Sequence, residues 1–298
     1  MRHIVIAGGS GFLGQSLASY FEKEGDKVTI LSRKPHNGQT YWDGKQLGSW
    51  VETLEGADVL INLAGKSVDC RYGAKNRQYI LNSRLESTTI LQEAMESCSN
   101  PPEVWLNASS ATIYIHAESQ LMTEDTGVCG DDFSMSVCKK WEATFFSKEL
   151  ENVRKVALRT SIVLGNEGGA FPKMKWLTRL GFGGRQGNGQ QLVSWLHIID
   201  FCRAIAFVIT NLQIEGVINV TAPNPVSNKV FMKYLQNTLK IPFGIFQPRI
   251  VLEVGAFLLG TETELLLKSR NVYPEKLHSN NFEFMYPTLP TAFAQLCL

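Results

Sequence analysis

Three glycines near the start of the chain, Gly8, Gly11 and Gly14, have the spacing of a loop that binds phosphate. They follow a short apolar run at 3–7, typical of a buried strand, and they open a segment with helical spacing. Glycine permits a tight turn and lets backbone N–H groups approach a phosphate at the helix start, where the helix dipole favours anions. The stretch predicts a loop for the pyrophosphate of a dinucleotide rather than a plain strand-to-helix turn. The residues expected in this loop are Gly8, Ser10, Gly11, Phe12, Leu13 and Gly14.

The end of the strand predicted at 27–32 bears on which dinucleotide binds. A site for NAD usually has an acidic residue here for the ribose hydroxyls, whereas a site for NADP has an arginine for the 2′-phosphate. The sequence reads LSRKP and contains no acid. Arg33 offers a planar guanidinium suited to phosphate. The alternative is that Arg33 and Lys34 are two solvated basic residues at the end of a strand. We therefore expect the cofactor to be NADP(H).

Two further strand ends should line the cofactor, because ligands of such sheets gather at the carboxyl ends of the strands. Asp43 ends the strand predicted at 40–43 and could accept a hydrogen bond from the adenine amino group. Leu63, Ala64 and Gly65 end the strand predicted at 58–65 and should run past the adenosine.

Short β-rich runs alternate with helical patterns through the first half of the chain. Further strands are predicted at 103–109 and 155–161, and helices at 76–97 and 136–150. This alternation indicates an α/β fold, a Rossmann-like doubly wound parallel sheet with a smaller C-terminal substrate domain. We expect a dinucleotide-binding domain at 1–165 and a substrate or lid domain at 166–298. The strand predicted at 217–221 is a candidate to return to the main sheet.

The composition excludes several classes of protein. The chain has 298 residues, of which 44% are hydrophobic and 19% charged, and its net charge of +1 indicates neither a nucleic-acid nor a membrane partner. Six cysteines without C-x-x-C spacing argue against a zinc site or any other metal site and against a disulfide framework. The longest apolar runs are too short to span a bilayer, and a strand begins at once, so we expect a cytoplasmic protein.

Several motifs in order resemble those of the extended short-chain dehydrogenase/reductases. They are the glycines at 8–14, NLAG at 62–65, SSATIY at 109–114 and LRTSIVLG at 158–165. The atypical sugar-nucleotide epimerase-like subfamily is a narrower match. The motifs that resemble it are SRKP at 32–35, WE at 141–142 and longer patterns within 187–200 and 272–293. That subfamily belongs to the NAD-dependent epimerase/dehydratases and has a C-terminal domain of unassigned function.

The resemblance implies a catalytic serine on the fifth strand and a Tyr-x-x-x-Lys pair on the next helix. Ser110 fits the serine, but Ser134 and Cys138 stand at the places of the tyrosine and the lysine. A tyrosine, with an ordinary pKa of about 10, needs a nearby cation to transfer protons at neutral pH. Neither replacement supplies that chemistry. The vacated space should hold water or admit a group of the substrate.

Other residues could move a proton instead. Tyr114 lies four residues after Ser110 and could face the pocket, or it could be a packed aromatic. His197, in SWLHIID, titrates near neutral pH, but a structural histidine bonded to Asp200 or to a carbonyl is the alternative. Glu124 lies on a loop expected over the substrate or at the surface. The run GNGQQ at 187–191 would line a site for a polar ligand such as a sugar or nucleotide.

Two functions follow from these residues. The first is an NADP(H)-binding oxidoreductase or epimerase-like enzyme, acting on an unidentified polar small molecule that could resemble a nucleotide sugar. The second is a catalytically inactive NADPH-binding sensor or regulatory protein, because the Tyr–Lys pair is missing. The helices predicted at 76–97 and 136–150 could also form the face of a homodimer.

Overall fold

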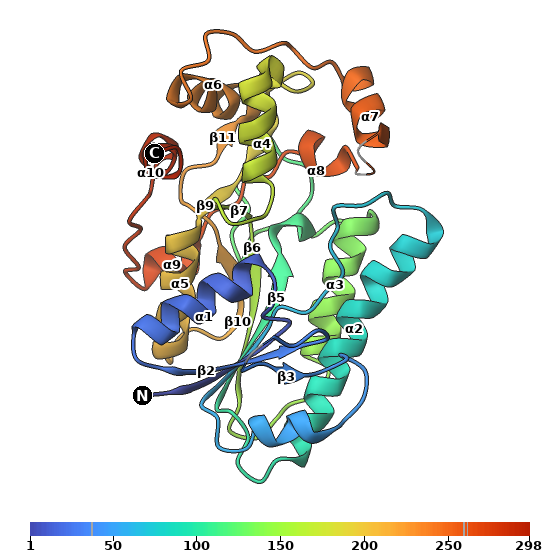
Figure 1. The fold of residues 1–298 in the computed structure, drawn as a ribbon, viewed down its shortest axis with the longest axis vertical. Coiled ribbons are helices and arrows are strands. Elements are labelled where there is room, and N and C mark those ends of the chain that lie inside the picture. The colour runs from blue at the N-terminus through green and yellow to red at the C-terminus, as the bar shows by residue number, and fades with distance from the viewer. Residues whose placement is uncertain (37, 259, 261) are drawn as a thin grey trace.

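The computed structural model describes residues 1–36, 38–258, 260 and 262–298, and Figure 1 shows its fold. The strands are β1 His3–Ala7, β2 Lys27–Ser32, β3 Thr40–Tyr41, β4 Val59–Asn62, β5 Val104–Ser110, β6 Arg154–Thr160, β7 Ile162–Leu164, β8 Leu192–Val193, β9 Trp195–His197, β10 Gly216–Val220 and β11 Val226–Ser227. The α-helices are α1 Phe12–Lys23, α2 Ala74–Ser97, α3 Phe133–Phe145, α4 Phe171–Leu177, α5 Ile198–Thr210, α6 Asn228–Thr238, α7 Arg249–Leu258, α8 Glu264–Leu267, α9 Glu275–Ser279 and α10 Leu289–Leu296. Short helical turns are η1 Ser49–Thr53, η2 Ala111–Ile113 and η3 Thr178–Phe182.

A parallel sheet of seven strands, in the order β10-β6-β5-β4-β1-β2-β3, forms the centre of the molecule. The chain moves outward from β1 to β3, and then returns to the other side of β1 through β4. The strand order therefore reverses between β1 and β4, the place where ligands bind in such sheets. The strand expected at 217–221 is β10, which pairs with β6 at the edge of the sheet.

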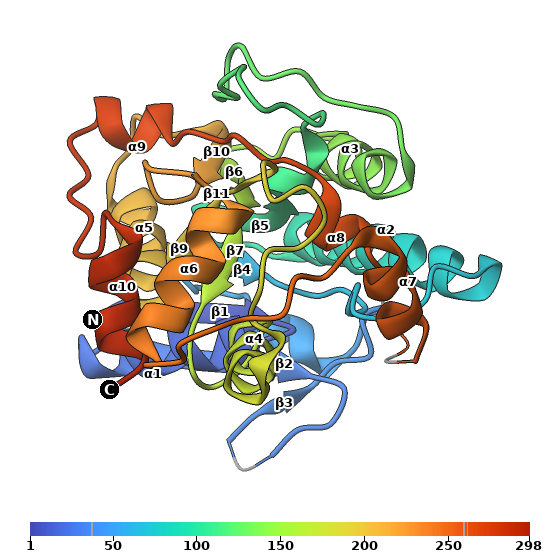
Figure 2. The same ribbon diagram turned by 90° about the horizontal axis from the view of Figure 1, so that it is seen from above.

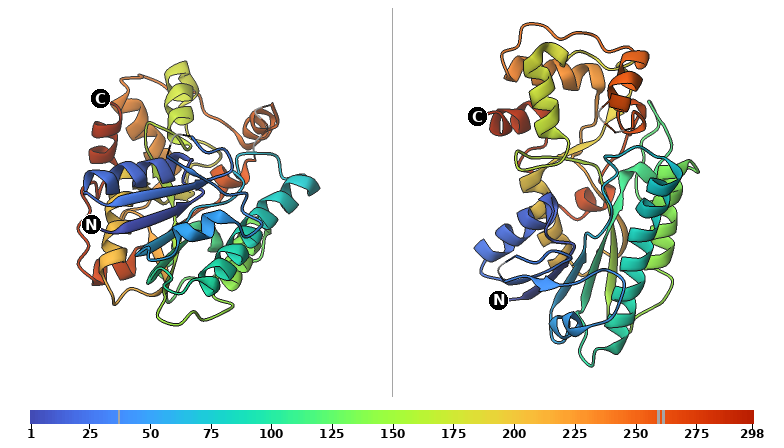
Figure 3. Two further views of the ribbon diagram at one scale, coloured as in Figure 1. Left: turned by 60° about the horizontal axis from the view of Figure 1, so that its bottom comes forward. Right: turned by 45° about the vertical axis from the view of Figure 1, so that its right-hand side comes forward.

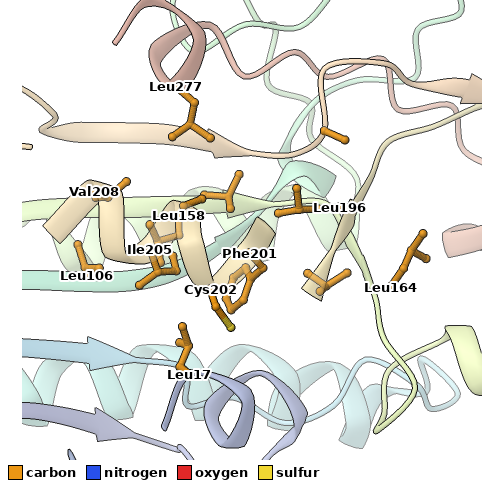
Figure 4. Close-up of a cluster of buried hydrophobic side chains, with 14 of the residues drawn as sticks. Leu17, Leu106, Leu158, Leu164, Leu196, Phe201, Cys202, Ile205, Val208 and Leu277 are labelled. Atoms are coloured by element: carbon orange, nitrogen blue, oxygen red, sulfur yellow. The ribbon is translucent and has the colours of Figure 1, made fainter. Parts of the chain in front are cut away.

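The sheet is buried on both faces, as a parallel sheet requires. Alternate residues of β1 enter opposite clusters, with Ile4 and Ile6 on one face and Val5 and Ala7 on the other. Helices α1 and α5 cover the first face, and α2 and α3 lie side by side on the second (Figure 3). On the first face Leu17 of α1 packs against the α5 side chains that Figure 4 shows. A homodimer through α2 and α3 stays a prediction.

The C-terminal part lies beyond the carboxyl ends of the strands (Figures 1 and 2). Phe171 of α4, Phe231 of α6 and Phe293 of α10 pack together there, in the same hydrophobic cluster that covers the first face of the sheet. The ring of Phe293 stacks on Phe171 at 5.5 Å and meets Phe231 edge-on at 5.2 Å. The domain division at residue 165 stays a prediction, because β10 belongs to the main sheet.

The helix after β5 differs from the one expected at 136–150. Helix α3 begins at Phe133, where Asp132 Oδ1 accepts a hydrogen bond from the N–H of Met135. It ends at Phe145 because the next residues turn into β6, with Asn152 in the left-handed conformation at φ 60°. Within the described part of the chain, no helix is both long enough and apolar enough to cross a membrane.

Candidate functional site

The glycine loop joins β1 to α1 beside the point where the strand order reverses. Gly8 has φ +73°, and a Cβ on it would lie 2.8 Å from the backbone of Ala64 after β4. A Cβ on Gly14 would lie 2.4 Å from Cα of Gly9. A side chain at either position would overlap backbone atoms, so both positions require glycine. The contact of Gly8 holds the loop against the segment after β4, and the contact of Gly14 holds the start of α1 against the loop.

Gly11 differs from the other two glycines because a Cβ there would meet no atom of the protein within 4 Å. It is the N-cap of α1, and it offers no side chain to the N–H groups of the first turn. Those N–H groups need a partner from outside the helix. The open side of Gly11 and the uncapped helix start fit a pyrophosphate, so the loop has the chemistry that NADP(H) requires.

The other predicted loop residues lie around this helix start. Ser10 is exposed at the tip of the loop. The ring of Phe12 packs over the glycines after β7, since a Cβ on Gly165 or Gly168 would lie within 3 Å of it. Leu13 packs against the core on the α1 face. The Phe12 and Leu13 side chains therefore hold the helix start in place, and their backbones remain available to a ligand.

The two residues expected at the adenosine end differ in their surroundings. Arg33 directly follows β2 and is exposed. Asp43 is half-buried, and its Oδ1 accepts hydrogen bonds from the N–H groups of Lys45 and Gln46 at 2.8 and 3.1 Å. Its carboxylate therefore holds the turn after β3, and a contact with adenine stays a prediction.

The residues after β4 lie next to the glycine loop. The N–H of Leu63 donates to Ala7 O at 2.8 Å, and the N–H of Ala64 donates to Oδ1 of Asn62 at 3.0 Å. Gly65 is exposed, and the guanidinium of Arg84 lies against it. Leu63, Ala64 and Gly65 thus follow β4, which ends at Asn62, beside the reversal point, and their contact with adenosine stays a prediction.

Ser110 stands at the carboxyl end of β5, where η2 begins. Its Oγ accepts a hydrogen bond from the N–H of Thr112 at 3.2 Å and lies 3.0 Å from the Thr112 hydroxyl. The Ser110 side chain is half-buried. The position suits a serine that orients a substrate oxygen at the end of the strand.

Ser134 and Cys138 lie on the buried side of α3, one helical turn apart. Cys138 packs against Ala111 and Ile113 of η2. Burial raises the pKa of Cys138 to about 12, so the group is a neutral thiol and not a nucleophile. Oγ of Ser134 is buried without a hydrogen-bond partner, and the Tyr72 side chain lies beside it. That the vacated space holds water or admits a group of the substrate stays a prediction.

Tyr114 does not face an open pocket. It is fully buried, its hydroxyl accepts from Arg159 at 2.9 Å and donates to Oδ1 of Asn219 at 2.8 Å, and its ring packs under Gly127. Burial raises its pKa above the ordinary value in spite of the nearby arginine. The surroundings favour the packed aromatic over the proton donor.

The buried network around Tyr114 is the part of the site region that sequence reasoning missed. Arg159 of β6 makes a two-pronged ion pair with Glu142 of α3, at 2.9 and 2.8 Å, and Ser109 donates to the same carboxylate at 2.5 Å. At the other end, Oε1 of Glu124 accepts from the N–H of Asn219 at 2.8 Å. Glu124 is therefore buried against β10 rather than placed over a substrate or at the surface. Ser109, Glu142 and Arg159 each lie in a motif that the sequence analysis quoted, but nothing in the sequence indicated that they contact one another.

His197 is a buried helix cap. Its Nδ1 accepts a hydrogen bond from the N–H of Ile199 at 3.1 Å, so the proton is on Nε2, which donates to Gln295 at 2.9 Å. The imidazole also stacks on Tyr286 at 3.9 Å. Burial lowers its pKa below the ordinary value. Both nitrogens are occupied, so the structural histidine is favoured, although its partners are not the Asp200 or carbonyl that we expected.

The loop at 187–191 is held by neighbouring segments, since the N–H of Gly187 donates to Gln247 O at 2.9 Å and the N–H of Lys229 donates to Gly189 O at 3.0 Å. Gln191 is buried and its Nε2 donates to Gln186 O at 3.0 Å, and Gln186 N–H donates to Asn228 at 2.8 Å. Asn188 and Gln190 remain exposed. These two side chains are the part of the loop that could still meet a polar ligand.

The strand order, the glycine loop at the reversal point and the serine at the end of β5 define a class of protein. They are the features of the extended short-chain dehydrogenase/reductases with a Rossmann-like fold. The chain belongs to the NAD dependent epimerase/dehydratase family, whose model matches residues 4–221. A second model, a domain of unknown function called DUF1731, matches residues 247–296. Both findings confirm the resemblance read from the sequence.

Several known proteins are similar to this chain over nearly its whole length. The epimerase family protein YfhF of Bacillus subtilis is 34% identical over 299 residues, which is 99% of this chain and 97% of that protein. The crystal structure of the human epimerase family protein SDR39U1 (isoform 2) with NADPH has 27% identity, a TM-score of 0.90 and 99% coverage of both chains. A nucleoside-diphosphate sugar epimerase from Corynebacterium glutamicum has 29% identity and a TM-score of 0.81, covering 99% of this chain and 58% of that one.

We predict that His197→Asn lowers the free energy of unfolding by about 1–3 kcal/mol at pH 8, because asparagine keeps the helix cap but loses the Gln295 bond and the stack on Tyr286. The pKa of His197 is depressed in the fold, so the wild type loses stability as the pH falls below about 6.5, where the unfolded chain takes up the proton first. The difference between the two proteins should therefore shrink toward acid pH. Urea denaturation at several pH values measures it, and a difference independent of pH would contradict this account.

Proposed function

We propose that this protein binds NADP(H) and acts as an NADP(H)-dependent oxidoreductase or epimerase-like enzyme on a small polar substrate. The observation that carries the proposal is the glycine loop. Gly11 leaves an open approach to the uncapped start of α1, whereas backbone atoms of the protein fill the space where a Cβ of Gly8 or Gly14 would lie. A plain turn would not need one glycine whose missing side chain faces nothing in the protein.

The residues that would hold the cofactor follow the strand ends. The first N–H groups of α1 would bind the pyrophosphate, and Arg33 would bind the 2′-phosphate of the adenosine ribose. Leu63, Ala64 and Gly65 would border the adenosine. When bound, NADP(H) would supply or accept a hydride at its nicotinamide ring.

The substrate would lie between the carboxyl ends of the strands and the C-terminal part. Ser110 would orient its reacting oxygen, and the exposed Asn188 and Gln190 could contact its polar groups. A nucleotide-sugar-like substrate is favoured because one of the similar structures is a nucleoside-diphosphate sugar epimerase.

An inactive NADPH-binding sensor is the second candidate. Ser134 and Cys138 stand in the places of the usual proton donor and its cation, and Cys138 carries no charge at neutral pH. Such a protein would bind the cofactor and leave it unchanged.

Oxidation of NADPH against a panel of carbonyl compounds and nucleotide sugars separates the two candidates. We expect turnover with at least one polar carbonyl compound, and we expect Ser110→Ala to reduce kcat by about 10²-fold or more at unchanged affinity for NADPH. An epimerase-like reaction consumes no NADPH, so the nucleotide sugars of the panel are also analysed for isomerised product, and NADPH binding with neither NADPH oxidation nor isomerisation would favour the sensor instead.

We predict that Gly11→Val abolishes binding of NADPH and leaves the free energy of unfolding nearly unchanged, because its side chain enters the phosphate path and no protein atom. Gly14→Val is the matched control. Its side chain would overlap the backbone of Gly9, so it should lower the free energy of unfolding by about 1–3 kcal/mol or more. Fluorescence titration and urea denaturation of both variants measure the two effects. Normal NADPH binding by a folded Gly11→Val protein would show that the phosphate site lies elsewhere.

We predict that Arg33→Ala weakens binding of NADPH by about 1.5–3 kcal/mol, the range of a charge-assisted contact, and leaves NADH nearly unchanged. Lys34→Ala, at the next and equally exposed position, controls for a general loss of positive charge and should have a smaller effect. Titration of each variant with both cofactors gives the comparison. Equal losses for NADPH and NADH, or a preference of the wild type for NADH, would exclude Arg33 as the phosphate ligand.

A further inference from the structure

Exposed apolar side chains gather in the C-terminal part, at one end of the long axis of the molecule (Figure 1). Two segments that are distant in the sequence supply six of them, and each is from 45% to 65% exposed. The six are Trp176, Leu180 and Phe182, from α4 and η3, and Phe243, Ile245 and Phe246, between α6 and α7. Single exposed apolar residues are common on soluble proteins, but a gathering of this kind indicates a binding surface.

The two segments run side by side, so their apolar side chains belong to one surface. The N–H of Ile245 donates to Gly181 O at 2.8 Å, and the N–H of Gln247 donates to Arg185 O at 3.0 Å. A Cβ on Gly184 would overlap the carbonyl of Ile245. The backbones are therefore in direct contact, and the apolar side chains extend from them into solvent.

Helix α7 follows the second segment and is apolar on two sides. Leu252 faces the protein and is buried, whereas Ile250 and Val254, about one helical turn apart, are 75% and 55% exposed. The charged residues of α7 are Arg249 and Glu253, which pair with each other at 2.7 Å. A helix with apolar residues on all sides is normally covered on all sides. The outer side of α7 therefore extends the apolar surface.

The exposed apolar side chains within 176–182, 243–246 and 250–254 are called the apolar end surface below. Its four aromatic side chains, at about 150–250 Å² each when fully exposed, leave roughly 400 Å² in contact with water. The largest apolar patch of a typical monomer measures about 300–600 Å² in total. The aliphatic side chains add an area of the same order, so this surface is larger than a monomer normally exposes.

The same part of the molecule carries an excess of positive charge. Residues 171–187 and 228–258 contain eight lysines and arginines and one acidic residue, whereas the net charge of the whole chain is only +1. Arg179 and Lys240 are exposed and have no carboxylate partner among the described residues. The net charge, from which we expected no membrane partner, therefore conceals a strongly basic end.

The cations lie among the exposed rings. The guanidinium of Arg185 lies over the ring of Phe246 at 4.5 Å, and both side chains are exposed. Arg179 lies between Trp176 and Phe182 in the sequence. Apolar side chains and cations thus occupy the same surface, which is the combination that binds to the interface of an anionic membrane.

We propose that the apolar end surface docks on a phospholipid membrane with anionic headgroups, and that it binds from one side without crossing the bilayer. The aromatic and aliphatic side chains enter the boundary between headgroups and acyl chains, and the lysines and arginines meet the anionic headgroups. A second copy of the chain is a poorer partner, because a two-fold contact brings the same cations together. The inference does not depend on the proposed function.

The test is co-sedimentation of the chain with phospholipid vesicles. We expect binding to vesicles of phosphatidylcholine mixed with phosphatidylserine, and binding about tenfold weaker or less to phosphatidylcholine alone, because only the mixed vesicles attract the cations. Raising the salt concentration should weaken binding to the mixed vesicles. Absence of binding to the mixed vesicles at low salt would overturn the proposal.

Two pairs of variants locate the contact. Phe243→Ser should weaken binding to the mixed vesicles by about tenfold. Its matched control is Leu212→Ser, because Leu212 is 79% exposed but precedes β10, at the opposite edge of the sheet, and it should leave binding unchanged. Arg179→Gln should weaken binding by about fivefold, whereas Lys23→Gln, at the exposed end of α1, should not.

Urea denaturation of each variant is measured alongside, and it should match that of the wild type because all four side chains are exposed. Equal losses of binding in Phe243→Ser and Leu212→Ser would show that the membrane contact lies elsewhere and overturn the proposal. A chain that forms a dimer, fails to bind vesicles and becomes a monomer in Phe243→Ser would place a second copy on this surface instead.

Discussion

The buried ion pair between Glu142 and Arg159 is the interaction on which the packing of α3 against the sheet depends. Both side chains are about nine-tenths buried, and they meet through two hydrogen bonds at 2.8 and 2.9 Å. Removing one partner of such a pair leaves a buried charge without compensation, which costs about 3–5 kcal/mol. The pair therefore attaches α3 to β6 in one register, and α3 in turn determines where Ser134 and Cys138 lie.

The network that extends from this pair joins the two parts of the chain. Arg159 donates to the Tyr114 hydroxyl, which donates to Asn219 on β10, and Asn219 Nδ2 donates to the Tyr273 carbonyl at 2.9 Å. A strand from the second half of the chain is thus fixed to the sheet of the first half by polar contacts as well as by pairing. The network therefore connects β6, β10 and the loop that carries Tyr273 through buried polar groups.

Helices α2 and α3 pack side by side, so a side chain from one can occupy space that the other leaves empty. Interiors are closely packed, and a serine and a cysteine in the places of a phenol and a long amine leave volume to be filled. Side chains from the α2 side do reach α3, since the ring of Tyr72 packs on Phe133 at 5.1 Å and the guanidinium of Arg84 lies over the ring of Trp141 at 5.1 Å.

The sequence alone determined the features that depend on local chemistry. The strands follow from apolar runs, and the glycine loop follows from backbone approaches that only glycine permits, as the contacts of Gly8 and Gly14 show. The family was likewise recognisable, because its motifs are short runs in a constant order. The end of α3 was misplaced, since a helix boundary depends on the turn that follows as much as on its own residues.

Only the tertiary structure decided which polar side chains are available. Tyr114, Glu124 and His197 have the residue types of proton donors, yet segments distant in the sequence bury them, and those segments occupy their polar atoms apart from Oε2 of Glu124. Tyr72 carries no spacing signal that links it to α3, and the packing of α2 on α3 brings its ring against Phe133. The physical reason is that the desolvation and hydrogen bonding of a side chain are set by all the neighbours around it, most of which come from other parts of the chain.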